Sequence, residues 1–184
     1  ASRRLPKAKP ITQPTQEDVA YDPKRLVLIG ASTGGIDALL KTTQQFSEDC
    51  PPTIIVQHTG GSFAKSLIKL LDRASPAKVT EALDGMPLQP GHIYMPPGDE
   101  AHLCLGEDRI PRISLQKREP VSGHRPSIDA LFLSGLPFAN HVTAALLTGM
   151  GRDGASGLKA LREAGARTIG QDEKTSVVYG MPRV

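Results

Sequence analysis

Apolar strands that alternate with helical segments constrain the fold of this chain more than any other feature of its sequence. Three runs are apolar on both faces of an extended chain: RLVLIG at 25–30, PTIIVQ at 52–57 and HVTAALL at 141–147. Strands of this kind are typical of parallel sheets covered by helices on both sides. The sequence therefore predicts an α/β fold, a doubly wound and mostly parallel sheet with helices on both faces.

Helical segments follow these strands, with apolar residues recurring on one face of each. Ser62 and Ser127 precede two of the segments and are predicted to cap them, because a serine oxygen can accept the unpaired N–H groups of a first turn. Gly165 is predicted to end the last helix, and ARTIG at 166–170 to form a fourth strand. The order of elements is thus strand and helix in alternation, without internal repeats.

The middle of the chain has a different pattern. Residues 77–115 contain short strand-like pieces separated by pairs that favour turns. These pairs are Asp84-Gly85, Pro90-Gly91, Pro97-Gly98 and Glu107-Asp108. Short strands broken in this way predict a short antiparallel β excursion from the main sheet.

Length and local composition indicate one folded domain behind an extended leader. A chain of 184 residues is long enough for one well-buried core and short for two. Residues 1–24 hold four of the 16 prolines and no periodic apolar pattern, so we expect a flexible linker or tail there and a folded domain at 25–184.

Charge and apolar content argue against two classes of partner. Four of the 22 basic residues lie in the first ten positions, and the other 18 nearly balance the 19 acidic ones. Aromatic residues make up 4% of the chain, so neither a basic stripe nor stacking platforms indicate nucleic-acid binding. No apolar run approaches the roughly 20 residues that span a bilayer, and we expect no membrane insertion.

The two cysteines, Cys50 and Cys104, show neither a disulfide framework nor the spacing of metal ligands. His102-x-Cys104 offers two ligands, which cannot hold a zinc ion alone, so we interpret it as part of a strand edge. The sequence predicts a cytoplasmic protein with neither a metal nor a cofactor.

Chemically useful side chains follow three of the predicted strands. Ser32 comes just after the first strand, His58 just after the second and Asp153 a few residues after the third. Because the carboxyl ends of parallel strands meet at one edge of a sheet, we expect these side chains to lie together there. Serine, histidine and aspartate are the nucleophile, general base and orienting carboxylate of an acyl-transfer triad.

Each of these residues also has a purely structural interpretation. Gly30-x-Ser32-x-Gly34 fits a nucleophile elbow, and it equally fits an ordinary turn with a serine cap. His58 can be a hydrogen-bonded residue at a strand end. Asp153 stands before Gly154 and a predicted helix, where an aspartate is a natural N-cap.

A nucleotide-binding Rossmann-like domain is a further alternative, because glycine-rich turns after a first strand also bind phosphates. GASTGGI places Ile36 where the third glycine of a short-chain dehydrogenase would stand. The three tyrosines, Tyr21, Tyr94 and Tyr179, lack the lysine four residues later that those enzymes use, and no Gly-Lys-Ser/Thr loop is present. These departures make the dinucleotide interpretation the weaker one.

A set of motifs in fixed order resembles one known family. IGASTGG, VQH, PPGD, HRPSIDALF, LTGMGRDGA and QDEKTSVVYGMPR are similar to the catalytic domain of the bacterial chemotaxis protein-glutamate methylesterase. The resemblance covers residues 25–184. It implies hydrolysis of glutamyl methyl esters on the cytoplasmic domain of chemoreceptors, releasing methanol, and deamidation of receptor glutamines.

The same resemblance implies a role for each site residue. Ser32 would be the nucleophile, His58 the base and Asp153 the carboxylate. The oxyanion requires backbone N–H donors, for which Thr33 and Met150 are candidates. The opposing hypothesis from a different class is a binding module of a signalling complex in which the triad is silent.

Three departures from the family pattern stand out. Family members usually carry an N-terminal receiver domain, so residues 1–24 would be the linker that follows one. They usually continue beyond GMPR with another helix, whereas this sequence ends at Val184. They commonly have Met-Pro after the triad histidine, where this chain has Thr59-Gly60-Gly61, so substrate access or preference is expected to differ.

Overall fold

The computed structural model describes residues 24–184, and the predicted linker at 1–24 falls almost entirely outside the described residues. A six-stranded sheet with strand order β3-β4-β2-β1-β7-β8 forms the centre, and all of its pairings are parallel. The strands are β1 (Leu26–Ala31), β2 (Thr53–Gln57), β3 (Lys78–Glu81), β4 (His92–Met95), β7 (Val142–Leu146) and β8 (Arg167–Gly170). The predicted parallel α/β fold is confirmed.

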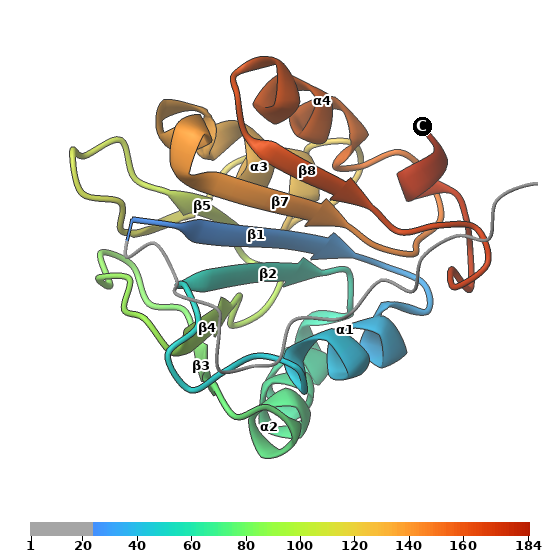
Figure 1. Ribbon diagram of the computed structural model, residues 1–184, viewed down its shortest axis with the longest axis horizontal. Helices are drawn as coiled ribbons and strands as arrows, with labels where there is room; N and C mark the ends of the chain where they lie inside the picture. Colours follow the sequence, from blue (N-terminus) through green and yellow to red (C-terminus); the bar gives the residue numbers. More distant parts are fainter. Residues whose placement is uncertain (1–23) are drawn as a thin grey trace, which may run out of the picture.

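Helices cover both faces of this sheet (Figure 1). Helices α1 (Gly35–Thr43) and α2 (Ala64–Ala74) lie on one face, and α3 (Ile128–Ser134) and α4 (Ala155–Glu163) lie on the other. Three short 3₁₀ segments complete the helical elements of the described chain: η2 (Gly61–Phe63), η3 (Leu136–His141) and η4 (Met181–Arg183).

The strand sequences explain the two-sided core. Leu28 of β1 and Val56 of β2 contribute to the apolar cluster beneath α3 and α4, whereas their neighbours Ile29 and Ile55 join the cluster beneath α1 and α2. Successive side chains of a strand point to opposite faces, so a strand buried on both faces must be apolar throughout. This is the pattern that the sequence shows.

The middle of the chain departs from the expectation of a purely antiparallel excursion. Strands β5 (His102–Leu105) and β6 (Ile113–Gln116) do form a separate antiparallel pair, as predicted. However, β3 and β4 join the main sheet in parallel, with Val79 opposite Ile93. Helix α2 connects β2 to β3 in a βαβ crossover. Part of the segment predicted as an antiparallel excursion therefore belongs to the main sheet.

The predicted helix caps have mixed outcomes. Ser127 caps α3, because its side chain accepts the N–H of Ala130 at 3.1 Å. Gly165 adopts φ 99° just after α4, as expected of a helix-ending glycine. The prediction for Ser62 is wrong: it lies inside η2, and Phe63, which precedes α2, makes no side-chain cap.

Strands β2, β1 and β7 are neighbours in register at the centre of the sheet, and this positions the site. Ala31 pairs with Gln57, and Gly30 pairs with Leu146. The connection after β1 runs through α1 to β2, whereas the connection after β7 runs through α4 to β8 on the opposite side. Ligands bind at such a switch point in open α/β sheets. Whatever follows these three strands therefore lies at one crevice on the carboxyl edge.

Candidate active site

Backbone hydrogen bonds continue beyond the ends of the central strands and hold Ser32 and His58 side by side. The N–H of Ser32 donates to the carbonyl of Thr148 at 3.0 Å, and the N–H of His58 donates to the carbonyl of Ala31 at 3.0 Å. Ser32 is thus tied to the segment after β7, and His58 to the end of β1. Their placement follows from strand register rather than from a flexible loop.

The side chains of Ser32, His58 and Asp153 form a continuous chain of contacts. His58 Nδ1 lies 3.3 Å from Ser32 Oγ, and His58 Nε2 lies 2.8 Å from Asp153 Oδ2. The His58 side chain is 10% exposed and that of Asp153 is 1% exposed. The structure thus brings together all three residues that the sequence singled out.

This arrangement selects one tautomer of neutral His58. The carboxylate of Asp153 can only accept, so Nε2 carries the proton and donates it to Asp153. Nδ1 is then left as an acceptor facing Ser32 Oγ. At 3.3 Å the contact is at the long end of the range, as is common for such pairs without a bound substrate. The pair has the geometry for moving a proton from Ser32 to His58.

Asp153 is held by the beginning of α3 rather than by the helix that follows it. Its Oδ1 accepts the hydroxyl of Ser127 at 2.8 Å and the N–H of Asp129 at 3.0 Å, and its Oδ2 accepts the N–H of Ile128 at 2.8 Å. The N-cap of α4 is Gly154, without a side-chain cap. The alternative prediction, that Asp153 caps its own following helix, is wrong.

These contacts keep Asp153 ionised. Burial by itself raises the pKa of this carboxyl, but hydrogen bonds from His58, the backbone of Asp129 and Ile128, and Ser127 outweigh burial and lower the pKa below its ordinary value. A negative charge at the start of α3 is also favoured by the unpaired N–H groups of its first turn. Asp153 therefore stays charged beside His58 throughout the neutral pH range.

His124 is a site residue that sequence reasoning missed. Its ring stacks on the ring of His58, with centroids 3.8 Å apart and an interplanar angle of 9°. The backbone of His124 is fixed by mutual hydrogen bonds with Val121 across a two-residue turn, in which Ser122 and Gly123 have φ 52° and 77°. Burial, together with the neighbouring charge of His58, lowers the pKa of His124. The HRPS stretch contained this histidine, but nothing local indicated its stacking partner.

The turn after β1 bends at Gly34 rather than at the serine. Gly34 has φ 79°, whereas Ser122 is the one non-glycine residue with positive φ in the described part of the chain. A Cβ atom on Gly34 would also lie 2.4–3.1 Å from the side chain of Val177, which only a glycine avoids at this position. Ser32 is therefore displayed at a strand-to-helix turn in relaxed backbone geometry.

A hollow of about 480 Å³ opens in front of Ser32 and His58. Besides these two residues it is lined by Thr33, Gly34, Ile36, Asp37, Gln57 and Thr59. Thr33 is thus in the wall of the hollow, next to the nucleophile candidate. Met150, the other predicted donor, is 71% exposed and is not among the lining residues.

The neighbouring N–H of Gly149 donates to the carbonyl of Val178 at 3.0 Å, which removes it as a donor to substrate. The oxyanion roles of Thr33 and Met150 remain predictions, and the geometry favours Thr33.

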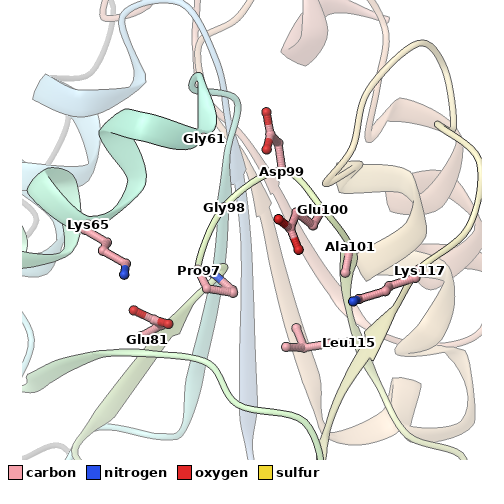
Figure 2. A pocket seen from close by; sticks show the side chains of 10 residues that line it. All are labelled: Gly61, Lys65, Glu81, Pro97, Gly98, Asp99, Glu100, Ala101, Leu115 and Lys117. Carbon is pink, nitrogen blue, oxygen red and sulfur yellow. The ribbon is translucent and has the colours of Figure 1, made fainter.

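A second hollow, of about 410 Å³, continues along the same edge of the sheet (Figure 2). It begins at Gly61, three residues after His58, and charged side chains of both signs surround it: Lys65, Glu81, Asp99, Glu100 and Lys117. These side chains come from α2, the ends of β3 and β6, and the loop after β4. The loop Thr59-Gly60-Gly61 therefore separates the two hollows.

The dinucleotide alternative depends on the glycine-rich turn after β1. The Gly35 N–H donates to the carbonyl of Ser32 at 2.8 Å and the Gln57 side chain fills the space beside Gly35, so this N–H is not offered to a phosphate. Within residues 24–184 no three His, Cys, Asp or Glu side chains cluster as metal ligands do.

His102 and Cys104 lie in β5, a strand of the two-stranded sheet, and both are fully buried. Both ring nitrogens of His102 are occupied, because Nδ1 accepts the N–H of Ser127 at 3.1 Å and Nε2 lies 2.9 Å from the carbonyl of Glu119. Among the described residues, no helix is long and apolar enough to cross a bilayer.

Comparisons with known proteins identify the family to which the chain is similar. The family model described as CheB methylesterase matches residues 27–184. The protein-glutamate methylesterase/protein-glutamine glutaminase of Agrobacterium fabrum is 51% identical over 162 residues, which are 88% of this chain and 46% of the relative. An enzyme of the same name, numbered 1, from Caulobacter vibrioides is 49% identical over 177 residues, 96% of this chain and 52% of the relative.

A solved structure extends the similarity to the fold. The crystal structure of the Thermotoga maritima CheB methylesterase catalytic domain superimposes with a TM-score of 0.82 at 34% identity, covering 86% of this chain and 85% of that one. The chain spans about half the length of the curated relatives it matches. On the family model, the sequence relatives and the superimposed structure, the chain belongs to the CheB methylesterase family.

Proposed function

We propose that this domain is a serine hydrolase that removes methyl esters from glutamate side chains on the cytoplasmic domain of chemoreceptors. The observation that carries the proposal is the contact chain from Ser32 through His58 to the buried carboxylate of Asp153. The names of the relatives supply the substrate class, a protein glutamate ester. No cofactor is required, because the three side chains supply nucleophile, base and orienting charge.

The proposed reaction runs in two halves. Ser32 Oγ attacks the ester carbonyl carbon while its proton passes to His58 Nδ1, and the tetrahedral intermediate carries its negative charge on the former carbonyl oxygen. The intermediate collapses as His58 returns the proton to the departing methoxide, which leaves as methanol. Water then attacks the acyl-serine with His58 again as base, releasing the glutamate carboxylate and restoring Ser32.

Asp153 acts in this proposal through His58. Its carboxylate holds the ring with Nδ1 toward Ser32 and stabilises the imidazolium that forms in each half-reaction. The ring of His124 closes one face of His58 and limits its rotation. Backbone N–H groups at the hollow, foremost that of Thr33, receive the oxyanion.

The experiment measures methanol released from a methyl-esterified receptor fragment. Ser32→Ala removes the covalent path and is expected to lower the rate by a factor of the order of 10⁶, as in other triads. Ser66→Ala, an exposed serine on α2, is the matched control and should leave the rate unchanged. If Ser32→Ala keeps more than a tenth of the activity, the serine only turns the chain and the binding-module hypothesis gains ground.

Glutamine deamidation is a second activity that the relatives' names favour, because they include protein-glutamine glutaminase. The same attack on a side-chain amide releases ammonia instead of methanol, with His58 protonating the leaving nitrogen. Incubation with a receptor fragment that carries glutamine at the modified positions should release ammonia, and Ser32→Ala should abolish this release together with that of methanol.

The proposal also includes the setting of the domain. A cytoplasmic location follows from the proposed substrate and accords with the free thiols of Cys50 and Cys104. A receiver domain joined through residues 1–24 is proposed for the whole protein from the resemblance to the family.

A further inference from the structure

Gln57 stands between the two loops that carry the proposed nucleophile and base, and its contacts suit a role beyond packing. It is the last residue of β2 and is 4% exposed. Its side-chain amide donates to the carbonyl of Ser32 at 2.8 Å and to the carbonyl of His58 at 3.0 Å. One NH₂ group thus cross-links the backbones of Ser32 and His58.

The observed orientation of the Gln57 side-chain amide leaves one of its polar atoms without a hydrogen bond. Its oxygen, Oε1, is buried and has no hydrogen-bond partner among the described residues. Turning the amide over would place Oε1 against two carbonyl oxygens and leave both donors unused, so the observed orientation is the one that both carbonyls require. A buried acceptor without a partner is rare and calls for an explanation. Here the explanation is that both N–H groups are committed to the site.

The bond to Ser32 has a geometric consequence for the next residue. In a trans peptide the C=O of one residue and the N–H of the following residue point in opposite directions. The Ser32 carbonyl is held by Gln57 and by the Gly35 N–H at 2.8 Å. The N–H of Thr33 must therefore point away from both, and within residues 24–184 it donates to no protein acceptor.

The other side of Thr33 is fixed as well. Its carbonyl accepts the hydroxyl of Thr148 at 2.9 Å, so the peptide on each side of Thr33 has one restrained oxygen. Thr33 also lines the hollow in front of Ser32 and His58. A free, rigid N–H one residue after the nucleophile, in the wall of that hollow, is suited to receive the charge of a tetrahedral intermediate.

We propose that Gln57 is a positioning residue that orients the Ser32–Thr33 peptide, so that the Thr33 N–H is preset as an oxyanion donor, while it also fixes the spacing of Ser32 and His58. The inference rests on the proposed esterase function and deepens it. A glycine at position 35 is consistent with this role of Gln57, because a Cβ atom there would collide with Gln57 Oε1.

Two substitutions separate this role from packing. Gln57→Met keeps the shape, removes both donors and also removes the unpartnered oxygen, so the domain should stay folded. Gln57→Glu places a carboxylate oxygen against the two carbonyls and should disturb the peptide further. Losing one preset oxyanion donor lowers kcat by about 10²–10³-fold, so kcat of Gln57→Met on the esterified receptor fragment should fall about 10²-fold with KM nearly unchanged.

Ser134→Ala is the matched control, because Ser134 is also a hydrogen-bonding side chain. It accepts the N–H of Leu105 at 2.9 Å and donates to the carbonyl of Leu131 at 2.6 Å, at the far end of α3. It should lose stability and keep kcat. A Gln57→Met variant that is folded and retains more than a tenth of wild-type kcat would overturn the inference.

A measurement on the unaltered chain covers the case in which Gln57 variants do not fold. A trifluoromethyl ketone analogue of the ester should form a tetrahedral adduct with Ser32, and the amide proton of Thr33 should move downfield on adduct formation. An adduct without this movement would overturn the inference. A wild-type chain that releases no methanol would overturn the proposed function and this inference with it, whereas an active wild type with an equally active Gln57→Met would overturn this inference alone.

Discussion

Asp153 and Asp129 cap each other's helices. Asp153, just before α4, accepts the backbone N–H of Asp129 at 3.0 Å in the first turn of α3. Asp129 in turn accepts the backbone N–H of Gly157 at 2.7 Å in the first turn of α4. The carboxylate that contacts His58 is thus part of the contact between the beginnings of α3 and α4. Loss of this carboxylate should therefore affect both stability and the proposed chemistry.

Asp153→Asn is expected to reduce both activity and stability. The asparagine NH₂ group would face hydrogen-bond donors that the Asp153 carboxylate now accepts. It also favours the wrong His58 tautomer, which lowers the rate roughly 10⁴-fold in comparable triads. Hydrogen bonds to a buried charge contribute about 1.5–3 kcal/mol, so the free energy of unfolding should fall by about 2 kcal/mol or more. Methanol release and urea denaturation measure the two effects.

Asp129→Asn is the matched comparison for that variant. Burial raises the pKa of Asp129, and the charge of Asp153 raises it further, so the ionised form of Asp129 is unfavourable in the folded state. Asparagine keeps an oxygen for the Gly157 N–H and removes the like charge beside Asp153. This variant should be more stable than Asp153→Asn by more than about 1 kcal/mol. Equal losses in the two variants would contradict the expectation that the charge of Asp129 is unfavourable in the folded state.

The loss of folding stability at acid pH should depend on Asp153. Its folded-state pKa is lowered from the ordinary 3.8, so the ionised form stabilises the fold. This contribution is complete above pH 3.8, which approximates the unfolded-state pKa, and is lost as pH falls through the lower folded-state pKa. Urea midpoints between pH 2.5 and 7 should drop at the acid end, and the drop should be shallower in Asp153→Asn. A parallel drop in both proteins would assign acid unfolding to other carboxyl groups.

The ring of His124 should matter for catalysis through its flat contact with His58. His124→Phe keeps a planar ring in the same place, whereas His124→Ala frees one face of His58. Stacked ring pairs contribute about 0.5–1.5 kcal/mol, so His124→Ala should lower kcat roughly 3- to 10-fold and His124→Phe should restore most of it. Steady-state kinetics on the ester substrate decide the matter. A poor Phe variant would point instead to a polar role for His124.

The predicted boundary near residue 24 has a direct test. Residues 1–20 are rich in proline and basic residues and lack an apolar pattern, so their deletion should leave melting temperature and methanol release unchanged. A loss of about 1 kcal/mol lowers the melting temperature of a domain of this size by roughly 2–4 °C. A larger drop would show that the leader contributes to the folded domain.

The sequence by itself determined the parallel sheet and the meeting of Ser32, His58 and Asp153. Strands buried on both faces must be apolar throughout, and parallel strands end at a common edge. Polar side chains that follow the apolar runs must therefore lie near one another at that edge. Sequence periodicity likewise located the helices, and Ser127, before the apolar face of Ile128, Leu131 and Phe132, correctly marked the start of α3.

Only the tertiary structure decided which partners these elements take. Strands β3 and β4 are four residues each, too short for their pattern to distinguish a parallel place in the main sheet from an antiparallel excursion. Asp153 has the local surroundings of an N-cap, yet the beginning of α3, 24 residues away in sequence at Asp129, offers it more donors. The stacking of His124 on His58 and the hydrogen bonds of Gln57 join distant segments, and nothing in either segment's sequence indicates the other as its partner. Propensity and periodicity are local, whereas hydrogen-bond partners in a packed core are set by which backbones meet in space.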